Sequence, residues 1–195
     1  MAISCYWRKV SCFDPTKAKD IDVVSMTPKD FELRYGYAPR GDVAEKVQIT
    51  IGDKSYSAIC MLGYNGIEAV LKHKGTINAG KMKQFIDDAC APLIVADVEW
   101  GIIDCAQINH TVDVKLSLER CFRGFWTYVP AYYPHLKPVE QIFALVKRFF
   151  REHEDEALGD PDKWIDIAFD QFRVGGPQAH IYSYCVHHEL WRQGL

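Results

Sequence analysis

The feature that most constrains this chain is a change of hydrophobic period on either side of a proline-rich loop. Residues 124–129 form a short apolar and aromatic run, as expected of a buried strand. Prolines at positions 130, 134 and 138 then prevent regular structure over about ten residues. After them the apolar residues recur at steps of three and four, which predicts an amphipathic helix with Pro138 in its first turn. Its predicted inner face consists of Val139, Ile142, Phe143, Val146, Phe149 and Phe150.

Glu140 lies in the first turn of this predicted helix. A carboxylate there is stabilised by the partial positive charge of the helix N-terminus. Two interpretations stay open for this stretch alone. Glu140 is either a surface residue that complements the helix dipole, or a functional acid at the rim of the preceding loop.

A second acidic residue follows an apolar run upstream. Residues 95–104 read VADVEWGIID, and a turn of small residues and His110 come next. This order places Asp104 at the carboxyl end of a strand, where ligands of open α/β sheets gather. Two carboxylates brought together by a strand and a helix are a usual way to hold Mg²⁺ or Mn²⁺. The sequence therefore predicts that Asp104 and Glu140 share one site.

The remaining elements predict an α/β fold. Alternating or apolar runs predict three consecutive antiparallel strands, and Asn65-Gly66 is a hairpin signal between the last two. Asn78 is a candidate N-cap for a following helix. The expected strands are 45–51, 56–62 and 67–72, with a further short β-branched run at 22–26, and the expected helices are 79–90 and 112–121. Such an order predicts a mixed sheet with helices on its faces.

Four segments together resemble the DDE-superfamily endonuclease domain of the mariner-type transposases. Two of them carry the acids, and two lie upstream in the same order as in that family. They are Asp104–His110 (DCAQINH), Pro130–Glu140 (PAYYPHLKPVE), Arg34–Gly41 (RYGYAPRG) and the hairpin region from Tyr56 to Ile67. The match covers about residues 22–151.

The resemblance implies a ribonuclease-H-like fold, with a mixed five-stranded sheet, three antiparallel strands first, and helices on both faces. It implies an endonuclease domain over residues 1–151 and a C-terminal helical extension over 152–195 packed on that domain. The implied activity is cleavage and strand transfer at DNA phosphodiesters with two divalent ions, Mg²⁺ or Mn²⁺. Two-metal chemistry of this kind relies on hard oxygen ligands, normally three carboxylates.

The sequence allows three alternatives for the first carboxylate of the set. Asp22 has the family's spacing to Tyr35 but starts an apolar run, whereas Asp14 ends one and would need an insertion. A third alignment places Thr27-Pro28 there and leaves no acid. We adopt Asp22, Asp104 and Glu140 as the predicted catalytic and metal-binding set.

Two substitutions depart from the family pattern beside these acids. Cys105 replaces an asparagine next to Asp104, and Lys137 replaces an asparagine before Pro138. A thiol cannot orient the neighbouring carboxylate as an amide does, and Lys137 brings a cation close to the predicted metals. His110 is either a loop residue bonded to backbone or a contact to DNA phosphate.

Composition limits the partners. The 195 residues are 48% hydrophobic, which suits one domain, and the formal net charge is −3. A mildly acidic chain argues against strong autonomous DNA binding, so we expect weak or non-specific binding. A homodimer is compatible with the sequence, and no apolar run is long enough to predict a membrane span. Seven scattered cysteines favour free thiols and an intracellular protein, nuclear in a eukaryote.

Two alternatives stay open. The family's helix-turn-helix modules have no counterpart before residue 1, so the chain is also compatible with a truncated or domesticated remnant, catalytically inactive and retained as an interaction module or without function. A ribonuclease-H-like nuclease acting on RNA would need a fourth clustered acid. His180, His187 and His188 near the C-terminus favour aromatic packing in a helix over a metal site, because adjacent histidines point to different faces.

Overall fold

The chain folds around one five-stranded sheet with the spatial order β3-β2-β1-β4-β5. The computed structural model describes residues 15–27, 40–42, 55–95, 98–129 and 137–177. β1 pairs antiparallel with β2 and parallel with β4; β2 and β3 are antiparallel, and β4 and β5 are parallel. The strands are β1 (Ala18–Met26), β2 (Tyr56–Gly63), β3 (Gly66–Lys74), β4 (Trp100–Ile103) and β5 (Trp126–Tyr128). The predicted mixed sheet, with its antiparallel strands first, is confirmed.

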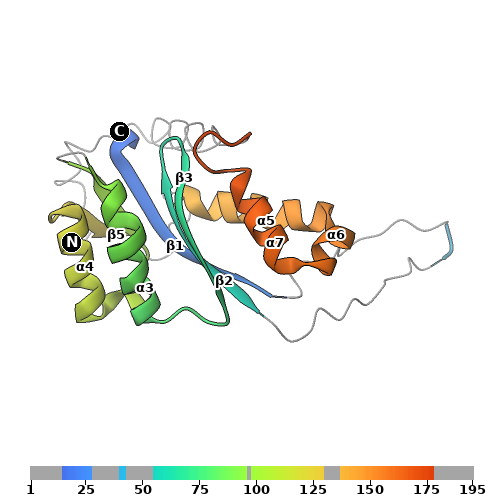
Figure 1. Ribbon diagram of the computed structural model, residues 1–195, viewed down its shortest axis with the longest axis horizontal. Helices are drawn as coiled ribbons and strands as arrows, with labels where there is room; N and C mark the ends of the chain where they lie inside the picture. The colour runs from blue at the N-terminus through green and yellow to red at the C-terminus, as the bar shows by residue number, and fades with distance from the viewer. Residues whose placement is uncertain (1–14, 28–39, 43–54, 96–97, 130–136, 178–195) are drawn as a thin grey trace.

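Helices cover both faces of this sheet (Figure 1). On one side lie α3 (Ala79–Phe85) and α4 (Val112–Phe122), and on the other lie α5 (Pro138–Glu152), α6 (Glu154–Gly159) and α7 (Pro161–Asp170). Short turns complete the described parts: η1 (Pro15–Lys17), the π-helical η2 (Ile86–Cys90), η3 (Ala91–Leu93) and η4 (Gln107–His110). None of the helices in the described ranges is long and apolar enough to cross a membrane.

The first of the three antiparallel strands differs from the predicted one. It is β1, which starts at Ala18, whereas the sequence suggested a short run starting at Asp22. The predicted strand at 45–51 lies outside the described residues. The start was missed because Lys19 and Asp20 are polar yet buried, which breaks the apolar alternation that marks a strand. Asp22 therefore lies in the middle of β1, not at its beginning.

The hairpin between β2 and β3 and the helix starts agree with the sequence. Tyr64 and Asn65 join the paired Gly63 and Gly66, and Gly66 takes a φ of 124°, which favours glycine. The side chain of Asn78 accepts a hydrogen bond from the Lys81 N–H at 3.0 Å and caps α3 as predicted. The helix after it runs on through η2 to Cys90.

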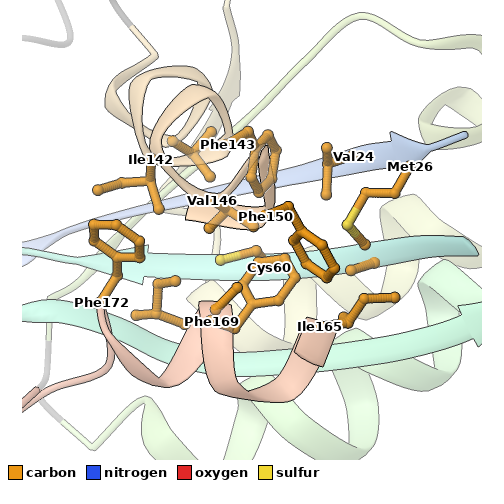
Figure 2. Packing of buried hydrophobic residues seen from close by; sticks show 14 of the residues in the cluster. Val24, Met26, Cys60, Ile142, Phe143, Val146, Phe150, Ile165, Phe169 and Phe172 are labelled. Carbon is orange, nitrogen blue, oxygen red and sulfur yellow. The ribbon is translucent and has the colours of Figure 1, made fainter. Parts of the chain in front are cut away.

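Alternation along β1 divides its side chains between two cores. Ile21 belongs to the cluster under α3 and α4, together with Ile103 of β4. Val24 and Met26 point to the opposite face, towards α5 and α7 (Figure 2). The large apolar side chains that meet them there are Ile142, Phe143, Val146, Phe150, Ile165, Phe169 and Phe172.

The predicted inner face of α5 is confirmed apart from Phe149, which is only partly buried. α5 begins at Pro138, and α7 packs against α5 over the same core. The described part of the predicted C-terminal extension thus shares the core of the strands before it. Residues 178–195, with the three histidines named above, lie outside the described residues.

Gly101 of β4 allows close packing on the α3–α4 side. A Cβ atom at this position would lie 2.6 Å from Cδ2 of Phe122, whose side chain is buried. The ring of Phe122 therefore takes the place of a side chain on β4. This contact brings the end of α4 directly onto the strand that leads to Asp104.

Candidate active site

The strand register places two of the predicted acids side by side. β1 and β4 run parallel, and the last pair in their register is Ile21 opposite Ile103. The next residue on each chain is Asp22 and Asp104, respectively. Neighbouring strands lie about 4.8 Å apart, and side chains at paired positions share a face. The two carboxylates therefore belong to one edge and one face of the sheet.

A hydrogen-bonded turn orients Asp104. Asn109 in η4 is buried, and its amide nitrogen lies 2.5 Å from Oδ1 of Asp104 and 3.3 Å from the Asp104 backbone oxygen. The backbone oxygen of Asn109 in turn accepts a hydrogen bond of 2.7 Å from the Tyr128 hydroxyl. Tyr128 of β5 thereby fixes the η4 turn, and this turn fixes the Asp104 carboxylate. Cys105 cannot perform this task, and Asn109, four positions further on, supplies the amide instead.

Asp22 forms an ion pair with Lys137. The Lys137 Nζ lies 2.6 Å from Oδ2 of Asp22, and the two side chains are only 5% and 12% exposed, respectively. Burial raises the pKa of Asp22, whereas the Lys137 charge and hydrogen bond lower it, and the nearby Asp104 charge raises it. The influence of Asp104 on Asp22 is electrostatic evidence that these acids lie in one site.

A third carboxylate, from Asp20, anchors the N-terminus of α5 to β1. Its Oδ2 accepts a hydrogen bond of 3.2 Å from the backbone N–H of Val139, in the first turn of α5. The residue before the helix, Lys137, provides no side-chain cap, so Asp20 satisfies one of the otherwise unpaired N–H groups of the helix. This bond joins residues 119 positions apart and fixes where Glu140 emerges.

The environment of Asp20 is unusual for a carboxylate. Its side chain is fully buried, and its Oδ1 meets no hydrogen-bond donor within the described residues. Burial raises the pKa of Asp20 to about 7, against the lowering effects of the Lys137 charge and the Val139 N–H. The charges of Asp22 and Glu140 raise the pKa further. Asp20 is thus electrically linked to both sides of the site.

Asp20 is not among the acids predicted from the sequence, although a signal for it was present. Asp20 and Asp22 are two positions apart, so in any strand they share a face. Asp20 is also a fourth acid of the kind that the RNA-nuclease alternative requires. Its complete burial, however, keeps it from contact with a substrate in this structure.

The structure brings two of the predicted acids together and leaves the third exposed. Asp22 and Asp104 follow paired strand positions, whereas Glu140 is exposed in the first turn of α5 and influences Asp20. Within the described ranges no three His, Cys, Asp or Glu side chains are close enough to hold a metal ion. Of the other candidates for the first acid, Asp14 lies outside those ranges, and Thr27 follows the end of β1, well past the position beside Asp104.

Two further residues line the turn after Asp104. Cys105 is exposed and donates its thiol hydrogen to the Val129 backbone oxygen, with a distance of 3.1 Å from Sγ. The ring of His110 stacks on Tyr128, with ring centroids 4.5 Å apart.

The cysteines in the described ranges are all free thiols: Cys60, Cys90, Cys105 and Cys121.

Comparison with known families identifies the chain. Residues 21–157 match the family described as DDE superfamily endonuclease, a range that contains Asp22, Asp104 and Glu140. The chain belongs to the DDE superfamily endonucleases. No curated protein sequence gives a significant match.

Solved structures of a mariner transposase share the fold of this DDE endonuclease domain. The Mos1 mariner paired end complex with Mn superposes with a TM-score of 0.70 at 19% sequence identity, over 98% of this chain and 56% of that chain. The Mos1 transposase catalytic domain with Raltegravir and Mg gives a TM-score of 0.60 at 17% identity, over 97% of this chain and 85% of that chain. The ribonuclease-H-like fold is thus confirmed. The DDE endonuclease domain described here spans little more than half of the chain in the paired end complex.

Proposed function

We propose that this DDE endonuclease domain cleaves DNA phosphodiesters with the help of divalent metal ions and joins the cut strand to a new site. The observation that carries the proposal is the parallel pairing of β1 and β4, which sets Asp22 beside Asp104. The Mos1 structures with Mn and with Mg, which share the fold, support Mn²⁺ or Mg²⁺ as the metal. Complexes of Mos1 with transposon ends support DNA as the substrate.

The donor chemistry of the site suits a hard divalent cation. Asp22 and Asp104 offer carboxylate oxygens, which Mg²⁺ and Mn²⁺ prefer to nitrogen or sulfur. The neighbouring carboxyl group of Asp20 is buried, and its Oδ1 meets no donor among the described residues. Asp22 and Asp104 would hold the ion, and Glu140 would complete the set when a substrate or a second ion draws its exposed side chain inward. A bound ion of this kind polarises the phosphate and activates the attacking water or hydroxyl.

The remaining contributions come from groups of the chain itself. Asn109 restricts Asp104 to one orientation, so that its carboxylate is already arranged for a ligand. Asp20 holds the first turn of α5 against β1 and so keeps Glu140 at the same edge. The N-terminus of α5 carries partial positive charge, which favours an anionic phosphate nearby.

The test is nicking of supercoiled plasmid DNA by the purified chain in Mn²⁺. Asp104→Ala and Asp22→Ala should each reduce the nicking rate by roughly 100-fold or more, because each removes a ligand of a metal-assisted reaction. Glu140→Ala should reduce it as well. Asp113→Ala, which removes an exposed carboxylate in the first turn of α4, serves as the matched control and should nick like the wild type.

Equal nicking by all the variants would assign the activity to a contaminating nuclease and end the proposal. Mn²⁺ binding without nicking would favour the inactive, remnant form of this domain. The net charge of −3 predicts that DNA binding by this chain alone is weak and declines with salt. A homodimer and a nuclear location remain proposals that need separate measurement.

A further inference from the structure

Lys137 stands out within the candidate active site because it is a buried cation among the acids. Its side chain is only 5% exposed, and its Nζ lies 2.6 Å from Oδ2 of Asp22. Lysine is rarely buried unless it is paired, so the position is specific and not a surface contact. It comes immediately before Pro138, whose fixed backbone and burial restrict where the Lys137 side chain can go.

The Lys137 charge also reaches the carboxylate behind Asp22. Asp20, two residues earlier on the same face of β1, is fully buried and lies within the field of Lys137. The one ammonium group thus attracts two carboxylates that would otherwise repel each other. In this arrangement the ammonium does electrostatically what a metal ion does in a carboxylate cluster.

The Lys137 ammonium lies 2.6 Å from Oδ2 of Asp22, so a divalent ion bound to that oxygen would lie close to the ammonium. Mg²⁺ binds carboxylate oxygens at about 2.0–2.1 Å and requires near-octahedral geometry. Oδ1 of Asp22 accepts the Val23 N–H at 2.7 Å and Oδ2 contacts the Lys137 ammonium, so a divalent ion at Oδ2 would have to share that oxygen with the ammonium. A divalent ion that binds next to the ammonium is also repelled by its charge.

We propose that the Lys137 ammonium is a built-in cation that occupies the metal-binding side of Asp22, so that Asp22 is available to a divalent ion only when Lys137 moves away. This inference rests on the proposed function. It predicts that divalent ions bind this domain weakly, chiefly through Asp104, and that removal of the ammonium strengthens binding at Asp22.

The test is titration with Mn²⁺ alone, in the absence of DNA, followed by electron paramagnetic resonance of the free ion and by calorimetry. Lys137→Asn should bind Mn²⁺ at least tenfold more tightly than the wild type. Lys137→Met, which preserves the apolar stem without the charge, should show the same gain and serves if the asparagine variant folds poorly. The double variant Lys137→Asn with Asp22→Asn should lose the gain.

The matched control is Lys115→Asn, which removes the same charge from an exposed position of α4. It should bind Mn²⁺ like the wild type, whereas a gain equal to that of Lys137→Asn would mean that net charge alone explains the effect and would overturn the inference. Wild-type binding that Asp104→Asn abolishes, together with unchanged affinity in both Lys137 variants, would overturn the inference alone. No binding in any variant would overturn both the inference and the proposed function.

Discussion

The two faces of β1 use the same strand in different ways. On the α3–α4 side the middle of the strand is apolar, and Ile21 packs there with Ile103 and the helices, whereas Lys19 at the start of the same face pairs with Glu68. On the α5–α7 side the inward residues change from Asp20 and Asp22 to Val24 and Met26 along the strand. One face is therefore core throughout the middle of β1, and the other is core in one half and a charged site in the other.

The difference shows how one face can hold both a stable core and a charged site. The apolar half is sealed by the aromatic residues of α5 and α7, which hold the helix in place (Figure 2). The charged half is closed by the N-terminus of the same helix, where Val139 and Lys137 meet the two aspartates. Packing in the first half thus determines the geometry in the second.

Loss of a large side chain from the apolar half should have the largest effect on stability. Phe150→Ala removes a ring that is 1% exposed, and we expect the free energy of unfolding to decrease by about 3–5 kcal/mol. Phe149→Ala is the matched control, because Phe149 is next in sequence but only partly buried. Urea unfolding of both variants measures the difference, and equal losses would contradict the assignment of Phe150 to the core.

Asp20 tests the charged half through its pH dependence. Its pKa rises from 3.8 in the unfolded chain to about 7 in the fold, so between these pH values the unfolded state loses its proton first. Stability therefore falls as pH rises through this window and then levels off. Asp20→Asn removes this decline, because the amide stays neutral and still accepts the Val139 N–H. At pH 8 we expect a gain on the order of 3 kcal/mol, and little gain at pH 4.

The measurement is the difference in unfolding free energy between Asp20→Asn and the wild type at several pH values. Asp20→Ala provides the matched comparison, since it also removes the charge but cannot cap α5. It should be less stable than Asp20→Asn at every pH, by about 1 kcal/mol. A pH-independent difference between Asp20→Asn and the wild type would show that the pKa of Asp20 is the same in the folded and the unfolded chain.

Gly101 tests the packing on the α3–α4 face of the sheet. Gly101→Ala would place a methyl group against the Phe122 ring, and we expect a loss of about 1–3 kcal/mol. Gly159→Ala in α6 is the control, because a Cβ there meets no atom within 4 Å. It should be neutral or slightly stabilising, since alanine favours helix. Thermal unfolding measures both, and a neutral Gly101→Ala would mean that the ring moves aside without cost.

Local patterns in the sequence were sufficient to predict several elements. The three- and four-residue spacing after Pro138 predicted α5 and its buried face, and Asn78 predicted the start of α3. The strand that ends before Asp104 could also be predicted, because an apolar run ends there in an acidic residue. These features depend on neighbours within one or two turns, which is why sequence alone reveals them.

The ion pair of Lys137 and the role of Asp20 could not be predicted in the same way. In the sequence Lys137 is only a departure from the family pattern, and the spacing of Asp20 and Asp22 shows a shared strand face but not the contact of Asp20 with α5. Their partners lie more than a hundred positions away and meet only because α5 packs across β1. The register of β1 and β4 likewise sets Asp22, and not Thr27, next to Asp104. No local signal in the sequence encodes this register.

The sequence by itself therefore determined the type of chain, the helices α3, α4 and α5, and the positions of Asp104 and Glu140 at the ends of their elements, because hydrophobic period and end signals are local properties of the polypeptide. Only the tertiary structure decided which aspartate stands beside Asp104 and which cation lies on it. Burial is the physical reason. It raises the free energy of an unpaired charge so strongly that a buried ion such as Lys137 needs a counter-charge, and the fold, not the sequence neighbourhood, supplies Asp22 for this purpose.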